Sequence, residues 1–153
     1  MQIATLEHVN ITVSNPVRTA ALLCRIFGWH IRWEGTSMKN GYTVHVGTRR
    51  SYLALYDGGK PAQPDQKSMG QGQAGLNHIA LVVDDLEAVE KPVRAEGLEP
   101  HTYGDYEPGR RFYFHDNDRV EYEIVSYASQ KDSLKREFTR QLGMMARFGA
   151  LAK

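Results

Sequence analysis

The sequence predicts an α+β fold in which two βαβββ modules form curved mixed sheets around a cavity, with a helix added at the C-terminus. The first observation is a repeat: residues 6–13 read LEHVNITV and residues 76–83 read LNHIALVV, with a histidine third in each. The second is the order that follows each run, namely a turn signal, a helical pattern and three short strand-like segments. The third is the length of 153 residues, which suits one compact domain.

The first module is expected to begin with a strand over residues 6–13, which ends at the turn residues Ser14–Pro16. A helical pattern over 16–28 follows and ends at Gly28, because glycine favours helix termination. Three segments in which apolar and polar residues alternate complete the module, at 30–35, 42–49 and 51–58.

The second module repeats this order. A strand over 76–83 leads through two aspartates into a helical pattern over 86–97. Pro92 lies inside that pattern and should bend or shorten the helix, since proline cannot donate the backbone hydrogen bond. Three further strand-like segments follow, at 98–104, 110–117 and 119–127.

Changes in composition set the boundaries of these parts. The first module covers residues 1–57 and the second covers 76–127, separated by a linker at 58–75 that is rich in Gly, Pro and Gln. Residues 128–153 predict an amphipathic helix. Its apolar stripe consists of Leu134, Phe138, Leu142, Met145 and Phe148. We expect this stripe to pack on a sheet or across a homodimer.

Composition also narrows the classes of function. Lys+Arg 19 against Asp+Glu 18 gives a net charge of +1, which argues against nucleic acid or a membrane surface as partner. No apolar run approaches the roughly 20 residues that span a bilayer, and the N-terminal residues lack the features of a leader. The single cysteine, Cys24, excludes an intrachain disulfide framework and is interpreted as a small core residue on a helix. These features predict a soluble, cytoplasmic protein and do not by themselves indicate its function.

Strand alternation separates an apolar face from a mixed face in each module. The apolar faces are expected to take the two helices. The mixed faces are rich in histidine and tyrosine rather than in lysine and glutamate, which suits a polar cavity better than open solvent. The residues collected on the mixed faces are His8, His45, Tyr52, Tyr56, His78, Tyr113 and Glu123.

The duplicated βαβββ pattern, the histidine in each first strand and the closing strand RVEYEIVSY resemble the vicinal oxygen chelate superfamily. This is the group of glyoxalase I, the fosfomycin and bleomycin resistance proteins and the extradiol dioxygenases. The segment HDNDRVEYEIV is similar to the family pattern D-P-D-G-N-x-x-E-L. Asp116 and Asp118 match, Asn117 and Arg119 replace the proline and the glycine, and Glu123 falls on the family's carboxylate.

The resemblance implies that metal ligands lie on the first and last strands of each module. His8, His78 and Glu123 occupy three of these positions, and Ala54 occupies the fourth, where no ligand is possible. Two imidazoles and one carboxylate form the facial set that is typical of non-haem Fe(II), although Zn(II), Mn(II) or Ni(II) also accept it. Glu121 shares a face with Glu123 and is the fallback ligand.

The other polar residues are given supporting roles. His45 and Tyr113 are candidate catalytic proton donors or acceptors, and Tyr52 and Tyr56 are candidate substrate-binding walls. The remaining histidines are assigned to surface or loop positions without a role: His30, His101 and His115.

Three functions are carried forward. The first is an extradiol-dioxygenase-like oxidoreductase that acts on a small vicinal diol or catechol, with Fe(II) as its metal. The second is a glyoxalase-type lyase or isomerase, against which the alanine at position 54 counts. The third is a metal-free binding or resistance protein with an aromatic groove. A homodimer is expected from the resemblance, and the modules pair either within one chain or across the dimer.

Overall fold

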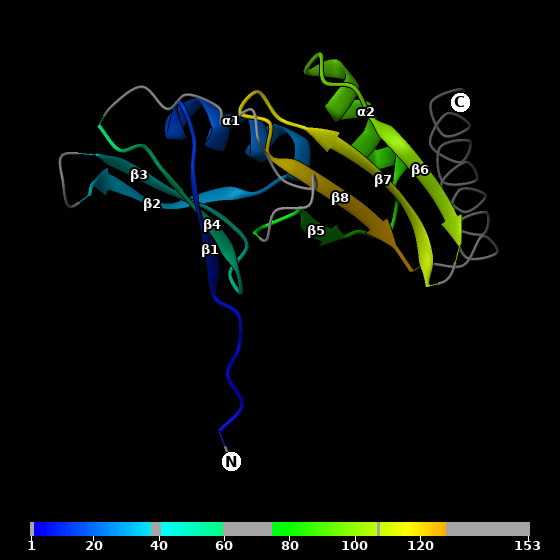
Figure 1. Ribbon diagram of the computed structural model, residues 1–153, viewed down its shortest axis with the longest axis horizontal. Helices are drawn as coiled ribbons and strands as arrows, with labels where there is room; N and C mark the ends of the chain where they lie inside the picture. Colours follow the sequence, from blue (N-terminus) through cyan, green and yellow to red (C-terminus); the bar gives the residue numbers. More distant parts are fainter. Residues whose placement is uncertain (1, 38–40, 60–74, 107, 128–153) are drawn as a thin grey trace, which may run out of the picture.

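The computed structural model describes residues 2–37, 41–59, 75–106 and 108–127 of the 153-residue chain. The first module contains one helix and four strands in the predicted order (Figure 1). These elements are β1 (His8–Thr12), α1 (Pro16–Phe27), β2 (His30–Thr36), β3 (Tyr42–Gly47) and β4 (Tyr52–Tyr56).

The second module has the same order of elements. They are β5 (Ile79–Val82), α2 (Glu87–Ala95), β6 (His101–Tyr106), β7 (Gly109–His115) and β8 (Glu121–Ser126). Helix α2 contains Pro92 and has 9 residues against the 12 of α1, in line with the predicted shortening. The α+β class and the two-module architecture are therefore confirmed.

Each module forms a four-stranded mixed sheet, ordered β1-β4-β3-β2 in the first and β5-β8-β7-β6 in the second. The first and last strands of a module pair in parallel, and the other neighbours are antiparallel. In the first sheet Ala54 lies between Asn10 and His45. In the second sheet Glu123 lies between Ala80 and Tyr113. Directly paired residues share a face, so this register confirms the predicted mixed faces.

Helix α1 begins and ends where its sequence signals predict. The Asn15 side chain accepts a hydrogen bond from the Arg18 backbone N–H at 2.9 Å, and Pro16 occupies the first turn. Gly28 follows the helix with a φ of 66°, a left-handed conformation that glycine adopts without steric cost. The buried side of α1 packs on β3 and β4.

One hydrophobic core spans both modules. Phe27 at the end of α1 contacts Phe114 and Tyr122 of the second sheet, with ring centroids 6.2 Å and 6.1 Å apart. On the surface, Arg25 of α1 makes a two-pronged ion pair with Glu96 just after α2, at 2.6 Å and 2.8 Å. The modules therefore join through their helix sides (Figure 1), and the mixed face of each sheet lies away from this shared core.

The turn between β7 and β8 is held by Asp116 and has Arg119 where the resemblance predicts a glycine. Asp116 accepts hydrogen bonds from the backbone N–H groups of Asp118 and Val120, both at 2.9 Å. Arg119 adopts a φ of 65°, the conformation that a glycine would take more easily. Glu123 keeps its expected place on β8 as a result.

Two sequence predictions fall on residues that the structure does not describe: most of the linker, at 60–74, and the amphipathic helix, at 128–153. Within the described ranges, no helix combines the length and the apolar character that crossing a bilayer requires.

Candidate metal centre

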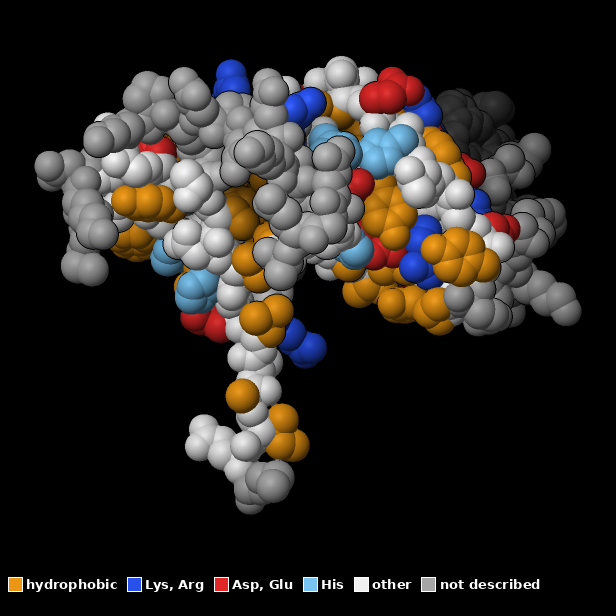
Figure 2. Space-filling model, viewed as in Figure 1, with side chains coloured by type: hydrophobic (Ala, Val, Ile, Leu, Met, Phe, Trp, Pro, Cys, Tyr) orange, Lys and Arg blue, Asp and Glu red, His pale blue; other side chains and the backbone are white. Residues whose placement is uncertain are grey.

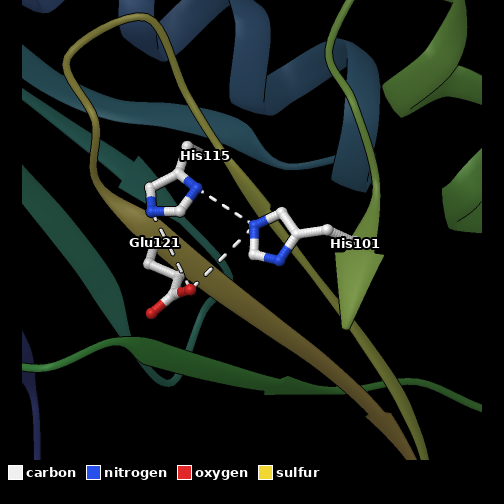
Figure 3. A group of neighbouring side chains, drawn as sticks. All are labelled: His101, His115 and Glu121. Carbon is white, nitrogen blue, oxygen red and sulfur yellow. Dashed lines mark hydrogen bonds and ion pairs between the residues drawn. The ribbon is translucent and has the colours of Figure 1, made fainter. Parts of the chain in front are cut away.

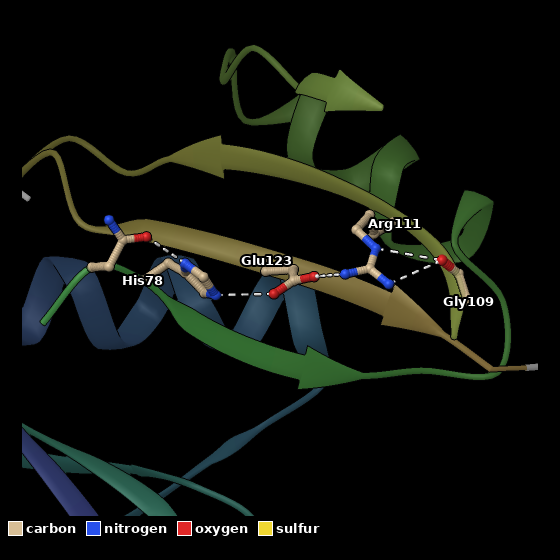
Figure 4. A network of polar contacts seen from close by, with 5 residues as sticks. His78, Gly109, Arg111 and Glu123 are labelled. Atoms are coloured by element: carbon tan, nitrogen blue, oxygen red, sulfur yellow. Dashed lines mark hydrogen bonds and ion pairs between the residues drawn. The ribbon is translucent and has the colours of Figure 1, made fainter. Parts of the chain in front are cut away.

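His78 and Glu123 form the best-defined polar pair on the mixed face of the second sheet. His78 directly precedes β5, and its Nε2 lies 3.0 Å from Oε2 of Glu123 on the neighbouring strand β8 (Figure 4). Its other ring nitrogen, Nδ1, lies 2.7 Å from the side-chain oxygen of Asn77. Both ring nitrogens thus face oxygen atoms that accept hydrogen bonds. A proton on His78 would allow it to donate a hydrogen bond to Glu123. A metal cation could instead lie between the two side chains, and histidine and carboxylate ligands supported by further hydrogen bonds are typical of metal sites.

Glu123 is nearly buried, with 7% of its surface exposed, and it has a second partner. Its Oε1 accepts a hydrogen bond from a terminal nitrogen of Arg111 at 3.0 Å, and Arg111 also donates to the Gly109 carbonyl oxygen (Figure 4). A buried carboxylate needs such partners, because an unpaired charge is costly away from water. Sequence reasoning gave Arg111 no role, although its position two residues before Tyr113 placed it on the same face.

Tyr113 lies beside this pair. Its ring meets that of His78 edge to face at a centroid distance of 5.7 Å. Burial raises the pKa of the Tyr113 hydroxyl, and its hydrogen bond to Glu123 raises the pKa further. Tyr113 is therefore a neutral hydroxyl that can donate a hydrogen bond in the site. Its catalytic role stays a prediction.

The first sheet carries a separate group built around Tyr52. The ring of His8 stacks on that of Tyr52 at a centroid distance of 4.9 Å. Nδ1 of His8 lies 2.8 Å from a carboxylate oxygen of Glu7, which also accepts from the Tyr52 hydroxyl at 3.4 Å. With Nδ1 held by a carboxylate, Nε2 is the nitrogen that His8 presents to a ligand.

His45 also packs against Tyr52. Its ring lies 4.6 Å from that of Tyr52 and 5.1 Å from that of Trp33, and the guanidinium of Arg32 sits 4.4 Å above Tyr52. Burial lowers the pKa of His45, and the nearby charges of His8 and Arg32 lower it further. His45 is therefore an uncharged imidazole at neutral pH, the form that accepts a proton. Trp33 and Arg32 are two neighbours that sequence reasoning missed.

Tyr56 shares the face of Tyr52, since both lie on β4 four residues apart and strand side chains alternate between faces. It is half-buried at the end of the strand, next to Gly41. Its predicted part in a substrate-binding wall remains a prediction.

The two groups of ligand residues do not meet within one chain. Among the described residues, the group of three side chains spaced closely enough to hold a metal ion does not include His8, His78 or Glu123. Histidines also appear at separate places over the two halves of the surface (Figure 2). One chain therefore brings together two of the three predicted ligands, and a site made by all three stays a prediction.

A different group of three is assembled in the second sheet. His101, His115 and Glu121 converge from β6, β7 and β8. Sequence reasoning assigned the two histidines to surface or loop positions without a role. His101 begins a strand and is partly exposed, and His115 ends a strand and is exposed. Strand alternation places His115 on the face of Tyr113 and Glu121 on the face of Glu123, but only the fold brings His101 to the same place.

Comparison with known families agrees with this architecture. The sequence profile of the Glyoxalase/Bleomycin resistance protein/Dioxygenase superfamily matches residues 5–124. The chain therefore belongs to this superfamily, as the resemblance predicted. Comparison with curated protein sequences gave no significant match.

Solved structures with the same fold differ in function. A domain from Frankia sp. EAN1pec has a TM-score of 0.68 at 18% identity, over 82% of this chain and 98% of that one. The fosfomycin resistance protein FosX from Listeria monocytogenes, complexed with Mn(II) and sulfate, has a TM-score of 0.61 at 18% identity, over 87% and 99%. The antibiotic-binding protein TnmS3 from Streptomyces sp. CB03234 has a TM-score of 0.65 at 17% identity, over 84% and 99%. At these identities the likeness shows the fold alone.

Proposed function

We propose that the protein is a divalent-metal-dependent enzyme that acts on a small substrate with two neighbouring oxygen atoms. The observation that supports this most is the pair formed by His78 and Glu123. Nε2 of His78 lies 3.0 Å from Oε2 of Glu123, and the Glu123 side chain is largely buried. An imidazole and a carboxylate, each held by a further partner, are the preorganised donors that a catalytic metal needs. FosX, with the same fold, has been solved with Mn(II).

The third ligand in this proposal is His8 of a second copy. The mixed faces of both sheets lie away from the shared core, and each exposes apolar surface: Trp33 is 50% exposed and Val82 is 68% exposed. The segment before β1 projects from the body of the protein (Figures 1 and 2), and its Ile3 and Leu6 are 87% and 73% exposed. Such surface is typical of a site that another copy covers. A two-fold symmetric dimer would place the first sheet of each copy against the second sheet of the other.

The side chains of the two faces then have complementary tasks. His45, as an uncharged imidazole, takes a proton from a substrate hydroxyl group. Tyr113 donates a hydrogen bond, and Arg111 and Arg32 attract an anionic oxygen. A bound metal would supply open coordination positions and, if it is Fe(II), a path for electrons from the substrate to dioxygen.

Extradiol cleavage of a catechol is the activity that we propose first, because two imidazoles, one carboxylate and a neutral base suit it. A second candidate is Mn(II)-dependent chemistry on an anionic substrate, since FosX, with the same fold, has been solved with Mn(II) and 1S,2S-dihydroxypropylphosphonic acid. Arg111 beside the carboxylate and Arg32 on the facing sheet favour this candidate, since both attract a negatively charged substrate.

The experiment that tests the shared site uses two inactive chains. H8Q and E123Q are co-expressed with different tags, and the mixed dimer is isolated through both tags. A site shared across the dimer regains one intact set of ligands, so the mixed dimer should bind one more metal ion than either parent. No gain in the mixed dimer would show that the ligands do not come from two chains.

Metal content and turnover then test the class of function. Protein purified without chelator is analysed for metals, reconstituted with Fe(II) or Mn(II), and assayed against catechols with an oxygen electrode and against fosfomycin. Methylglyoxal with glutathione serves as the control for the lyase alternative. A chain that binds no divalent metal, yet binds small aromatic compounds, would instead be a metal-free binding protein, as TnmS3 is an antibiotic-binding protein.

A further inference from the structure

We propose that His101, His115 and Glu121 form a second divalent-cation site, suited to Zn(II), on the mixed face of the second sheet. Three strands supply these residues: β6 begins at His101, β7 ends at His115 and β8 begins at Glu121 (Figure 3). Their ligand atoms lie within 4.8 Å of one another, the single such group of three within the described residues. This site is distinct from the pair of His78 and Glu123 on which the proposed function rests.

The distances fit one ion. Nε2 of His101 lies 3.0 Å from Nδ1 of His115, and it lies 4.0 Å from Oε1 of Glu121. In the tetrahedral sites typical of Zn(II), two donors at about 2.1 Å from the ion are separated by about 3.4 Å. The two observed separations lie on either side of this value. Small side-chain movements would be enough to bring the three donors around an ion.

His101 is already oriented for this role. Its Nδ1 lies 2.9 Å from the hydroxyl oxygen of Thr102, to which it can donate a hydrogen bond. That tautomer directs the Nε2 lone pair toward His115 (Figure 3). A histidine ligand in a metal site commonly donates its other N–H to an oxygen in this way.

An irregularity in β6 places His101 on this face. His101 pairs with Tyr113, whereas Gly104 pairs with Arg111, so β6 carries one more residue than β7 between these pairs. If the register at Gly104 simply continued, Thr102 would face Tyr113 and His101 would point to the opposite, helix-covered face. The extra residue is accompanied by a φ of 51° at Thr102, an unfavourable conformation for a β-branched side chain. Backbone strain of this kind is typical of functional sites.

The surroundings allow an ion to enter and to keep water ligands. The side chains are partly open, with exposures of 34% for His101, 47% for His115 and 22% for Glu121. Two neutral imidazoles and one carboxylate are donors that Zn(II) accepts, and solvent would supply its remaining ligands. The carboxylate balances part of the charge of the ion.

The second site is separate from the first. Glu121 and Glu123 lie two residues apart on β8, a spacing of roughly 7 Å along a strand. The ring of Tyr113 contacts both groups, at centroid distances of 5.7 Å from His78 and 6.3 Å from His101. An ion at one site cannot share ligands with an ion at the other, so each site can be removed alone.

The test is a Zn(II) titration of the full chain, monitored by a competing chromophoric chelator. The H78Q/E123Q background removes the first site, and we expect it to bind one Zn(II) per chain. Adding H115Q should abolish this binding, whereas adding H30Q, which removes an exposed histidine at the start of β2, should not change it. T102V keeps the branched side chain but loses the oxygen beside His101, and it should weaken binding by about 10- to 100-fold.

The proposal fails if the H115Q variant binds as much Zn(II) as the H30Q variant in this background. Because His115 is an exposed residue at the end of its strand, loss of folding is not expected to obscure the result. Circular dichroism of each variant checks this. The same titration separates the two hypotheses: if E123Q alone leaves the number of bound ions unchanged, the proposed first site fails while the second still stands.

Discussion

The two modules share one backbone plan and differ in the side chains that this plan displays. In the first, the ladder across β1, β4 and β3 reads Asn10, Ala54 and His45. In the second, the ladder across β5, β8 and β7 reads Ala80, Glu123 and Tyr113 at the equivalent place. The last strand thus carries alanine at this place in the first module and glutamate in the second. Only the second module therefore carries a carboxylate at the centre of its mixed face.

This difference divides the chemistry between the sheets. The first sheet offers stacked rings, a neutral imidazole and Arg32, and the second offers a buried carboxylate with a histidine and Arg111. Neither sheet presents all the groups that the proposed reaction needs. A duplicated module can thus give one complete site when two unlike halves face each other, whereas two identical halves would repeat the same groups.

The largest expected effect comes from removing the carboxylate that distinguishes the second sheet. E123Q keeps the size of the side chain but loses the charge that neutralises a cation. We expect the affinity of the proposed first site for divalent metal to fall by more than about 100-fold, beyond the 10- to 100-fold typical of supporting residues. Metal titration measures this. The matched control is E34Q, which changes an exposed carboxylate on β2, and an equal loss in both variants would contradict the prediction.

A carboxylate placed in the first sheet, at the position equivalent to Glu123, tests whether this difference between the modules controls metal coordination. Ala54 pairs with His45 on the mixed face and is 2% exposed. A54E is expected to add a fourth protein ligand, so metal should remain bound while turnover falls, because one coordination position for substrate or oxygen is closed. A54Q, of similar size but uncharged, is the control. Unchanged turnover in A54E alone would argue against an open coordination position at this place.

The turns that precede the last strands provide a further contrast. The turn from β3 to β4 is held by Thr48 and Ser51 on the surface, whereas the turn from β7 to β8 depends on the buried Asp116. Burial raises the pKa of Asp116 from 3.8 to about 6. The folded protein then retains a proton that the unfolded chain has released between about pH 4 and pH 6, so stability falls as pH rises through this window.

D116N should remove this fall. The difference between 3.8 and about 6 corresponds to at most about 3 kcal/mol of unfolding free energy. Urea unfolding of both proteins, in the presence of a chelator and at several pH values, measures it. The stability of the wild type relative to D116N should decrease from pH 4 to pH 6 and stay constant above. Parallel curves for the two proteins would show that Asp116 does not titrate in this way.

The smallest expected effect concerns Arg119 in the same turn. Its φ of 65° is unfavourable for a residue with a side chain, and no non-glycine residue of the turn between β3 and β4 has a positive φ. R119G should therefore stabilise the protein by about 0.5–1 kcal/mol, the relief of strain exceeding the greater flexibility of glycine in the unfolded chain. Thermal unfolding measures this gain. A lower melting temperature would mean that the arginine side chain contributes more than its backbone strain costs.

Much of the fold could be predicted because it depends on local patterns. The repeat of LEHVNITV and LNHIALVV fixed the order of the elements, and alternation along each strand placed Glu123 and Tyr113 on one face. Capping residues such as Asn15 and Gly28 marked the ends of the first helix. These signals act within a few residues of the chain, so they can be read without the structure.

The rest depended on contacts between distant residues. The tertiary structure joined the modules through α1 and α2, which left His8 apart from His78 and Glu123 within one chain. It also inserted one extra residue into β6, a shift of register that no local pattern reveals, and thereby turned His101 toward His115. Side-chain identity and strand alternation are properties of the sequence, whereas the choice of which strands and faces meet is settled by the packing of the whole core.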